Sequence, residues 1–169
     1  MFVFDKNKDY PKETESLVVI RFQDCDPLRH LNNAKYFDYF FNAREDQVPK
    51  LYGLQVTDFY KTYHAAWVIY NHNISYLKPA DMGEWVKIKS RLVWFNHNTI
   101  VVEYAMYDKD ESQLKTLLWS TMRYIDIESG RSTEHEGEVL DFLHATKYPL
   151  HDFEKIDIMH RIKQIKEHL

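Results

Sequence analysis

The chain has 169 residues, 44% of them hydrophobic and 15% aromatic, so its length and composition suit one domain with a bulky core. Its formal net charge of −4 gives no electrostatic case for non-specific binding of nucleic acid. The single cysteine, Cys25, excludes a disulfide within the chain and favours a reducing compartment, so we expect the protein to be cytoplasmic. The polar N-terminus is not typical of a secretory signal, and no apolar run approaches the roughly 20 residues that span a membrane.

The first third of the chain predicts an arm, a strand and a loop. Residues 1–15 are polar after a short apolar start, and we interpret them as an N-terminal arm. Residues 17–22 are rich in β-branched side chains and predict a strand. Residues 23–31 predict a loop that Pro27 restricts.

A long aromatic helix should follow this loop. It is expected to begin at Asn32 or Asn33, because an asparagine side chain accepts a backbone N–H that the first helical turn leaves unpaired. Its apolar residues cover a wide face through residue 47, which is typical of a helix enclosed by other structure. Pro49 is expected to end or kink it.

The middle of the chain predicts four long strands joined by polar turns. They lie at residues 63–77, 85–95, 99–107 and 114–127. Four strands in succession favour an antiparallel meander. The first run would extend to about 50 Å, longer than usual strands, so we expect it to bend or to carry a bulge. The predicted fold is α+β, with one sheet wrapped around one helix.

The C-terminal part predicts two helices. Residues 138–145 form the first, which Pro149 follows. Asp152 is the expected N-cap of the second, an amphipathic helix. Its outer face is expected to carry Lys155, Arg161, Lys163 and Lys166. We interpret it as docked on its own domain or on a neighbouring subunit, with a membrane-surface or calmodulin-like role as the alternative.

Two segments resemble a known family. They are RFQDCDPLRHLNNAKYFDYFFNAR at 21–44 and NISYLKPADMGE at 73–84. Together they resemble the hot-dog-fold acyl-CoA thioesterases of the 4-hydroxybenzoyl-CoA thioesterase type. The resemblance implies a five-stranded antiparallel sheet around one long central helix at residues 16–132, after the arm and before a helical extension at 133–169. It also implies a homodimer or homotetramer in which sheets join edge to edge and active sites lie at the interface.

The resemblance places the catalytic carboxylate at Asp26, as nucleophile or as general base for water. It places an oxyanion-binding backbone N–H at Asn33, where the helix start supplies unpaired donors and partial positive charge. His30 is a tentative catalytic residue with a structural role as the alternative. Without the family, a cap of the turn before Pro27 is favoured over catalysis as the role of Asp26. Asp24 is expected to hold the loop through hydrogen bonds.

The resemblance also implies residues that contact the substrate. Arg29 stands where the family commonly has glycine, so the loop is expected either to take another path or to use Arg29 to bind a phosphate or carboxylate. Tyr36 is a candidate substrate contact, because the aromatic residues of the helix either line a pocket for a ring or a chain or fill the core. His97, Asn98 and Thr99 fall where the family places a turn near the nucleotide. Candidate cations for the phosphates of coenzyme A are Lys78, Arg91, Arg123 and Arg131.

The predicted function is hydrolysis of an acyl-CoA to a free acid and CoA. The alternatives are an acyl-ACP thioesterase and a non-catalytic protein that binds acyl thioesters. Coenzyme A would be part of the substrate, and no other cofactor is expected. The histidines show no His-x-x-x-His pair on a clear helix face, so no metal site is predicted. Neither nucleic acid nor membrane is an expected partner, and the sequence leaves the acyl group open.

Overall fold

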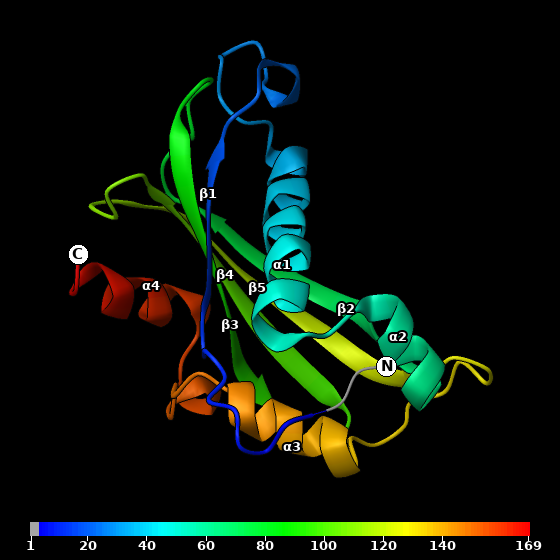
Figure 1. Cartoon of the computed structure of the whole chain (residues 1–169). Helices are drawn as coiled ribbons and strands as arrows, with labels where there is room; N and C mark the ends of the chain where they lie inside the picture. The colour runs from blue at the N-terminus through cyan, green and yellow to red at the C-terminus, as the bar shows by residue number, and fades with distance from the viewer. Residues whose placement is uncertain (1–3) are drawn as a thin grey trace.

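The computed structural model describes residues 4–169, so the first three residues of the predicted arm lie outside the described part. One antiparallel sheet of five strands curves around a long helix, α1 (Figure 1), as the sequence predicted. The strands are β1 (Thr14–Val19), β2 (Ala65–Tyr76), β3 (Trp85–Phe95), β4 (Thr99–Asp108) and β5 (Leu114–Asp126). The fold is therefore α+β, and it is the hot-dog fold.

The strand order corrects the predicted four-strand meander. The sheet runs β1-β3-β4-β5-β2, so only β3, β4 and β5 form consecutive hairpins. β2 lies at the far edge beside β5, and the chain then crosses to begin β3 next to β1. Periodicity shows that a segment is a strand, but it carries no signal for which neighbour the strand selects.

The first strand lies three residues earlier than predicted. β1 pairs with β3 from Thr14↔Ser90 to Val19↔Trp85, and it ends where β3 begins. Beyond that point the chain turns into a short 3-10 helix, η1 (Phe22–Asp24), although its apolar pattern continues. β1 therefore ends because it has no partner strand beyond Val19, and not because the type of side chain changes.

β2 carries the expected irregularity but begins later than predicted. A bulge interrupts its pairing with β5 between Ile69 and Asn71. The residues before it form an unpredicted helix, α2 (Val56–Tyr63). His64 ends this helix in the left-handed conformation, with φ of 50°. The β-branched and aromatic residues of α2 hid it in the sequence, because packing overrode their strand propensity.

α1 starts as predicted and ends later. The Asn32 side chain accepts the Ala34 N–H at 3.0 Å, which opens a 3-10 turn, η2 (Asn33–Lys35). α1 then runs over Tyr36–Tyr52, with Pro49 inside its last turn. Gly53, at φ of 69°, ends the helix, and its N–H donates to the Pro49 carbonyl. Near a helix end the proline removes a single hydrogen bond, so it does not terminate α1.

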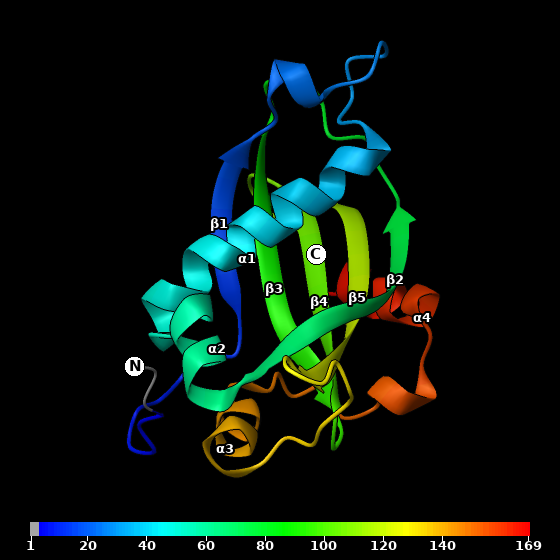
Figure 2. The ribbon, with the colours of Figure 1, turned by 90° about the vertical axis from the view of Figure 1, so that its right-hand side faces the viewer.

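α1 lies in the hollow of the curved sheet (Figure 2), and its aromatic face forms the core. Phe40 is fully buried there and packs on Tyr104 of β4, with ring centroids 5.6 Å apart. The described part of the N-terminal arm also contributes, because Tyr10 packs against Phe142 of the C-terminal extension. The core is therefore built from α1, the sheet and both terminal segments.

The C-terminal extension forms α3 (Gly137–Thr146), a 3-10 turn η3 (Phe153–Lys155) and α4 (Ile158–Lys166). α4 begins after Asp157, whose side chain accepts the His160 N–H at 2.7 Å, so the predicted cap at Asp152 was wrong. α4 packs on the sheet face opposite α1 (Figure 1), which confirms that it docks on its own domain.

Arg161 of α4 was predicted to lie on the outer face of this helix, but its side chain is buried. It donates two hydrogen bonds to the carboxylate of Glu103 on β4, at 2.9 and 3.0 Å. The prediction placed Arg161 among the exposed cations because it used helical spacing alone. The helix sequence carries no information about a buried anion on a strand far away in the chain. Among residues 4–169, no helix is both long enough and apolar enough to cross a membrane.

Candidate active site

The half-buried carboxylate of Asp26 caps its own loop. Its Oδ1 accepts the N–H groups of Leu28 at 2.9 Å and His30 at 3.2 Å. The backbone closes the same turn, since Asp26 N donates to the His30 carbonyl and Arg29 N donates to the Asp26 carbonyl. Within the part of the chain that the structure describes, no hydrogen bond involves Oδ2. One oxygen thus fixes the carboxylate while the other is available for chemistry.

Arg29 adopts a backbone conformation that glycine adopts at little cost. Its φ is 67°, in the left-handed region. Its carbonyl accepts the Met82 N–H at 2.9 Å, and its side chain is exposed. Replacement of the family's usual glycine therefore leaves a glycine-like backbone angle at this position.

The loop of Asp26 is joined to the turn that precedes β3. Leu31 N donates to the Ala80 carbonyl at 2.8 Å, and His30 and Asp81 form an isolated β-bridge. The His30 Nε2 atom lies 3.4 Å from Asp81 Oδ1. His30 therefore has a structural partner, and its imidazole retains partial exposure next to Asp26.

Asp24 holds the loop against α1, as predicted. Its Oδ2 accepts the hydroxyl of Tyr39 at 2.9 Å, and that hydroxyl accepts the Arg21 N–H at 2.8 Å. The Asp24 carbonyl accepts the Asn32 N–H at 2.9 Å. Burial, followed by the bond to Asp24, raises the pKa of Tyr39 to about 12, so the phenol stays protonated as the donor.

The start of the helix presents an unpaired donor. Asn33 is the first residue of η2, so its N–H has no partner within the helix. The Asn33 carbonyl accepts the hydroxyl of Tyr76 from β2 at 3.0 Å, which attaches the helix start to the sheet. The ring of Tyr36 lies beneath it, 5.1 Å from that of Tyr76 and only 2% exposed. Tyr36 thus fills the core below Asn33.

The predicted nucleotide-binding turn does not join the Asp26 site within one chain. β3 begins beside the turn that contacts Asp26 and runs away from it, so the β3–β4 hairpin lies at the other end of the sheet (Figure 2). His97, Asn98 and Thr99 are in this hairpin. Asn98 accepts the Tyr124 N–H through its carbonyl and donates to Ser132 Oγ through Nδ2, so it has a structural role there.

The candidate cations differ in availability. Arg91 is buried and paired with Glu13 and Glu103, so it is not a free phosphate ligand. The Arg123 guanidinium lies 5.0 Å from the centre of the Tyr70 ring. Lys78 and Arg131 are exposed. Among residues 4–169, no group of three or more histidine, cysteine, aspartate or glutamate side chains is arranged to hold a metal ion.

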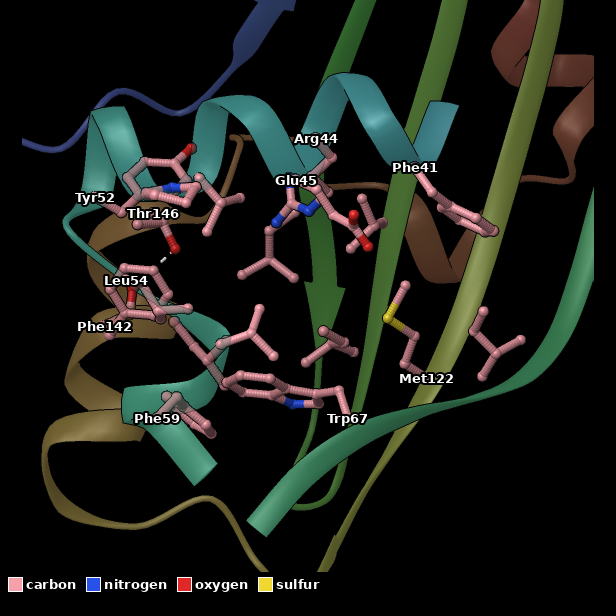
Figure 3. A pocket seen from close by; sticks show the side chains of 18 of the residues that line it. Phe41, Arg44, Glu45, Tyr52, Leu54, Phe59, Trp67, Met122, Phe142 and Thr146 are labelled. Atoms are coloured by element: carbon pink, nitrogen blue, oxygen red, sulfur yellow. Dashed lines mark hydrogen bonds between the residues drawn. The ribbon is translucent and has the colours of Figure 1, made fainter. Parts of the chain in front are cut away.

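Sequence reasoning missed a large apolar cavity at the other end of α1. Its volume is about 320 Å³, and its lining comes from the second half of α1, α2, the inner face of the sheet and α3 (Figure 3). Two of these walls were hidden, because α2 was not predicted and α3 was placed outside the core domain. The aromatic residues of α1 were the one available signal, since they suggested either a pocket or a filled core.

Comparison with known proteins decides the family. Residues 20–143 match the model of the thioesterase-like superfamily. The chain belongs to this superfamily. It is 26% identical over 132 residues to the long-chain acyl-CoA thioesterase FadM of Escherichia coli K12, and the match covers 76% of this chain and 96% of FadM.

Solved structures show the same fold. YbaW of Escherichia coli, described as a probable thioesterase, superposes with a TM-score of 0.71 at 23% identity, covering 80% of this chain and 99% of YbaW. SAV2348 of Staphylococcus aureus, solved in complex with CoA, gives a TM-score of 0.70 at 13% identity. It covers 88% of this chain and 97% of SAV2348.

Proposed function

We propose that this superfamily member is an acyl-CoA thioesterase that uses Asp26 and the backbone N–H of Asn33. The observation that carries the proposal is the geometry of Asp26. Two backbone N–H groups hold one carboxylate oxygen, and among residues 4–169 the other oxygen has no hydrogen bond, in a loop that leads through η2 into α1. A fixed carboxylate in the loop that leads to an unpaired helix donor suits attack on a carbonyl that becomes an oxyanion.

Two reaction courses fit this arrangement. As a general base, Asp26 takes a proton from water while the water oxygen bonds to the thioester carbon. As a nucleophile, its carboxylate oxygen bonds to that carbon and forms a mixed anhydride, which water then hydrolyses. In both courses the Asn33 N–H donates to the carbonyl oxygen as negative charge develops, and the C–S bond breaks to release the thiolate of CoA.

Isotope labelling separates the two courses. A single turnover in H₂¹⁸O puts the label into the Asp26 carboxylate only if water attacks a mixed anhydride at the aspartyl carbonyl. We expect mass spectrometry of the peptide that contains Asp26 to distinguish this result from direct attack of water on the thioester, which leaves the peptide unlabelled.

The substitution Asp26→Asn tests the site itself. It keeps the shape and removes the base, so we expect turnover of acyl-CoA to fall by about 10²–10⁴-fold. Release of free thiol from a panel of acyl-CoAs measures this. Asp38→Asn is the matched control, since Asp38 is an exposed residue of α1. An unchanged rate in folded Asp26→Asn would remove Asp26 from the mechanism. A separate comparison of hydrolysis rates on the same acyl group carried by CoA and by acyl carrier protein identifies the preferred carrier.

A further inference from the structure

The cavity beside α1 has the shape and chemistry of a site for a hydrocarbon chain. It follows α1 from Phe41 to Tyr52, and its volume of about 320 Å³ falls within the usual range for small-molecule sites. Figure 3 shows Phe41 and Met122 at one end and Tyr52 and Thr146 at the other. Trp67 and Phe59 form the wall between β2 and α2.

Four of the polar side chains on the wall are already engaged by the protein, while others such as Glu45 also line it. The four engaged side chains donate elsewhere in the chain: Thr146 Oγ1 to Phe142 O at 2.8 Å, Tyr52 Oη to Pro11 O at 3.1 Å, Arg44 Nη1 to Ser90 Oγ at 2.9 Å and Trp67 Nε1 to His135 Nε2 at 2.9 Å. A hydroxylated ring placed here would exchange hydrogen bonds with water for few new ones, and that exchange is unfavourable. An alkyl chain loses none, so the lining favours alkyl over hydroxyaromatic acyl groups.

The distance along α1 from Asn33 to the cavity indicates which lengths of acyl chain would reach it. Phe41 lies eight residues beyond Asn33, which is about 12 Å at the helical rise of 1.5 Å per residue. An extended acyl chain advances about 1.25 Å per carbon, given C–C bonds of about 1.5 Å, so about ten carbons reach Phe41. Tyr52 lies about 28 Å from Asn33 on the same measure. Chains of about 12 to 22 carbons therefore end inside the cavity.

We propose that the cavity receives the chain of a long, unbranched acyl thioester, and that α3 closes its far end and limits chain length. The proposal rests on the proposed function, because the thioester carbonyl is placed at Asn33. Between Asn33 and the cavity the chain follows the α1 face that carries Phe37 and Phe41, which are half-buried and contact the His72 ring of β2, so this ring has to move aside for the chain. α3 contributes Phe142, Leu143 and Thr146 to the lining, so a helix of the C-terminal extension sets specificity.

Filling the cavity at each end tests the proposal through the chain-length profile. Thr146→Met adds bulk at the far end and is expected to lower kcat/KM for docosanoyl-CoA, whose 22 carbons reach that end, by about tenfold or more, with dodecanoyl-CoA unchanged. Met122→Phe fills the end near Phe41. It should lower kcat/KM for dodecanoyl-CoA as well and leave kcat/KM for octanoyl-CoA unchanged. Leu140→Phe is the control, since Leu140 is on α3 and does not line the cavity. Its profile should match the wild type.

A binding measurement gives a second readout that does not depend on turnover. Palmitate should change the fluorescence of Trp67, whereas octanoate should have little effect, and Trp67→Phe should abolish the change. Hydrolysis that depends on Asp26 but shows a flat length profile, equal losses in both filled variants, or preference for 4-hydroxybenzoyl-CoA would overturn the cavity proposal alone. Failure to hydrolyse any acyl-CoA, with palmitate still bound at Trp67, would instead reject the proposed function.

Discussion

At the scale of single residues, Arg29 shows how hydrogen bonds hold a non-glycine residue at a backbone angle that favours glycine. A non-glycine residue in the left-handed region carries roughly 1–2 kcal/mol of strain. Two backbone hydrogen bonds of Arg29 hold the angle, one to Asp26 and one from Met82. The loop of Asp26 thus holds Arg29 at an angle that glycine would adopt at little cost.

Substitutions at Arg29 should follow backbone preference and not charge. Arg29→Val places a β-branched residue at φ of 67° and should lower the free energy of unfolding by about 1–2 kcal/mol. Arg29→Gly relieves the strain but frees the unfolded chain, so we expect a change within about 1 kcal/mol. Leu28→Val at the exposed neighbour is the control. Denaturant melts measure all three, and equal losses in the glycine and valine variants would contradict this account.

The Asp26 loop was also where sequence reasoning reached furthest. The Asp-Pro step and the Asn32 cap are local signals, and the structure contains both the turn and the cap. The pairing of His30 with Asp81 was not predictable, because it joins segments 51 residues apart through their backbones. Hydrogen bonds between residues close in sequence can be predicted from the residue types, whereas contacts between distant segments can be predicted only when the fold is known.

At the scale of elements, α4 is attached to the sheet by a buried ionic cluster. Glu103 has a fully buried side chain that accepts from Arg91, Arg161 and Trp119. Burial alone would raise the pKa of this carboxyl, but hydrogen bonds and charges from Arg161 and Arg91 outweigh it and hold the pKa below 4.5. α4 therefore docks through charge as well as through its apolar residues.

Removing one member of the cluster should loosen α4. Arg161→Met keeps much of the volume but leaves Glu103 with less compensation, so we expect a loss of about 3 kcal/mol in the free energy of unfolding. Lys163→Met on the exposed side of α4 is the matched control and should fall within about 0.5 kcal/mol. Urea melts followed by tryptophan fluorescence, which includes Trp119, measure both. Equal stability of the two variants would exclude the cluster as the attachment of α4.

The same cluster predicts a pH dependence. Because the folded pKa of Glu103 is depressed, its contribution to stability is complete above the unfolded value of 4.5 and is lost as pH falls through the folded pKa. The difference in free energy of unfolding between wild type and Arg161→Met should therefore shrink as pH falls below 4.5. A difference that stays constant or grows in acid would contradict the assignment of this effect to Glu103.

A helix or strand was predictable where its own residues, and not its partners in the fold, determine it. α1, α3 and the β3, β4 and β5 strands follow from caps, periodicity and polar turns. α2 was missed because its residues suit a strand, and β2 was given the wrong neighbour because an edge position is a property of the sheet. Arg161 was misplaced for a related reason, since its partner belongs to another element.

At the scale of the whole molecule, β2 is an edge strand with unusual exposure. Val68, Ile69 and Tyr70 are 40%, 51% and 69% exposed on it. An exposed apolar edge is a template for pairing with another chain, and natural proteins normally protect it. We propose that two copies of this chain join their sheets along β2, which would place both cavities beside the interface because Ile69 lines the cavity.

Charge on this edge should separate the copies without unfolding them. In Val68→Glu the new carboxylate lies opposite Arg123 of β5, its cross-strand neighbour, so the fold keeps a favourable pair. Two such carboxylates near a two-fold axis repel each other, and we expect sedimentation velocity to show a monomer where the wild type is a dimer. Ile127→Glu, an exposed apolar residue after β5, is the control and should remain dimeric. A wild-type monomer, or a Val68→Glu dimer of undiminished affinity, would show that β2 is not the interface.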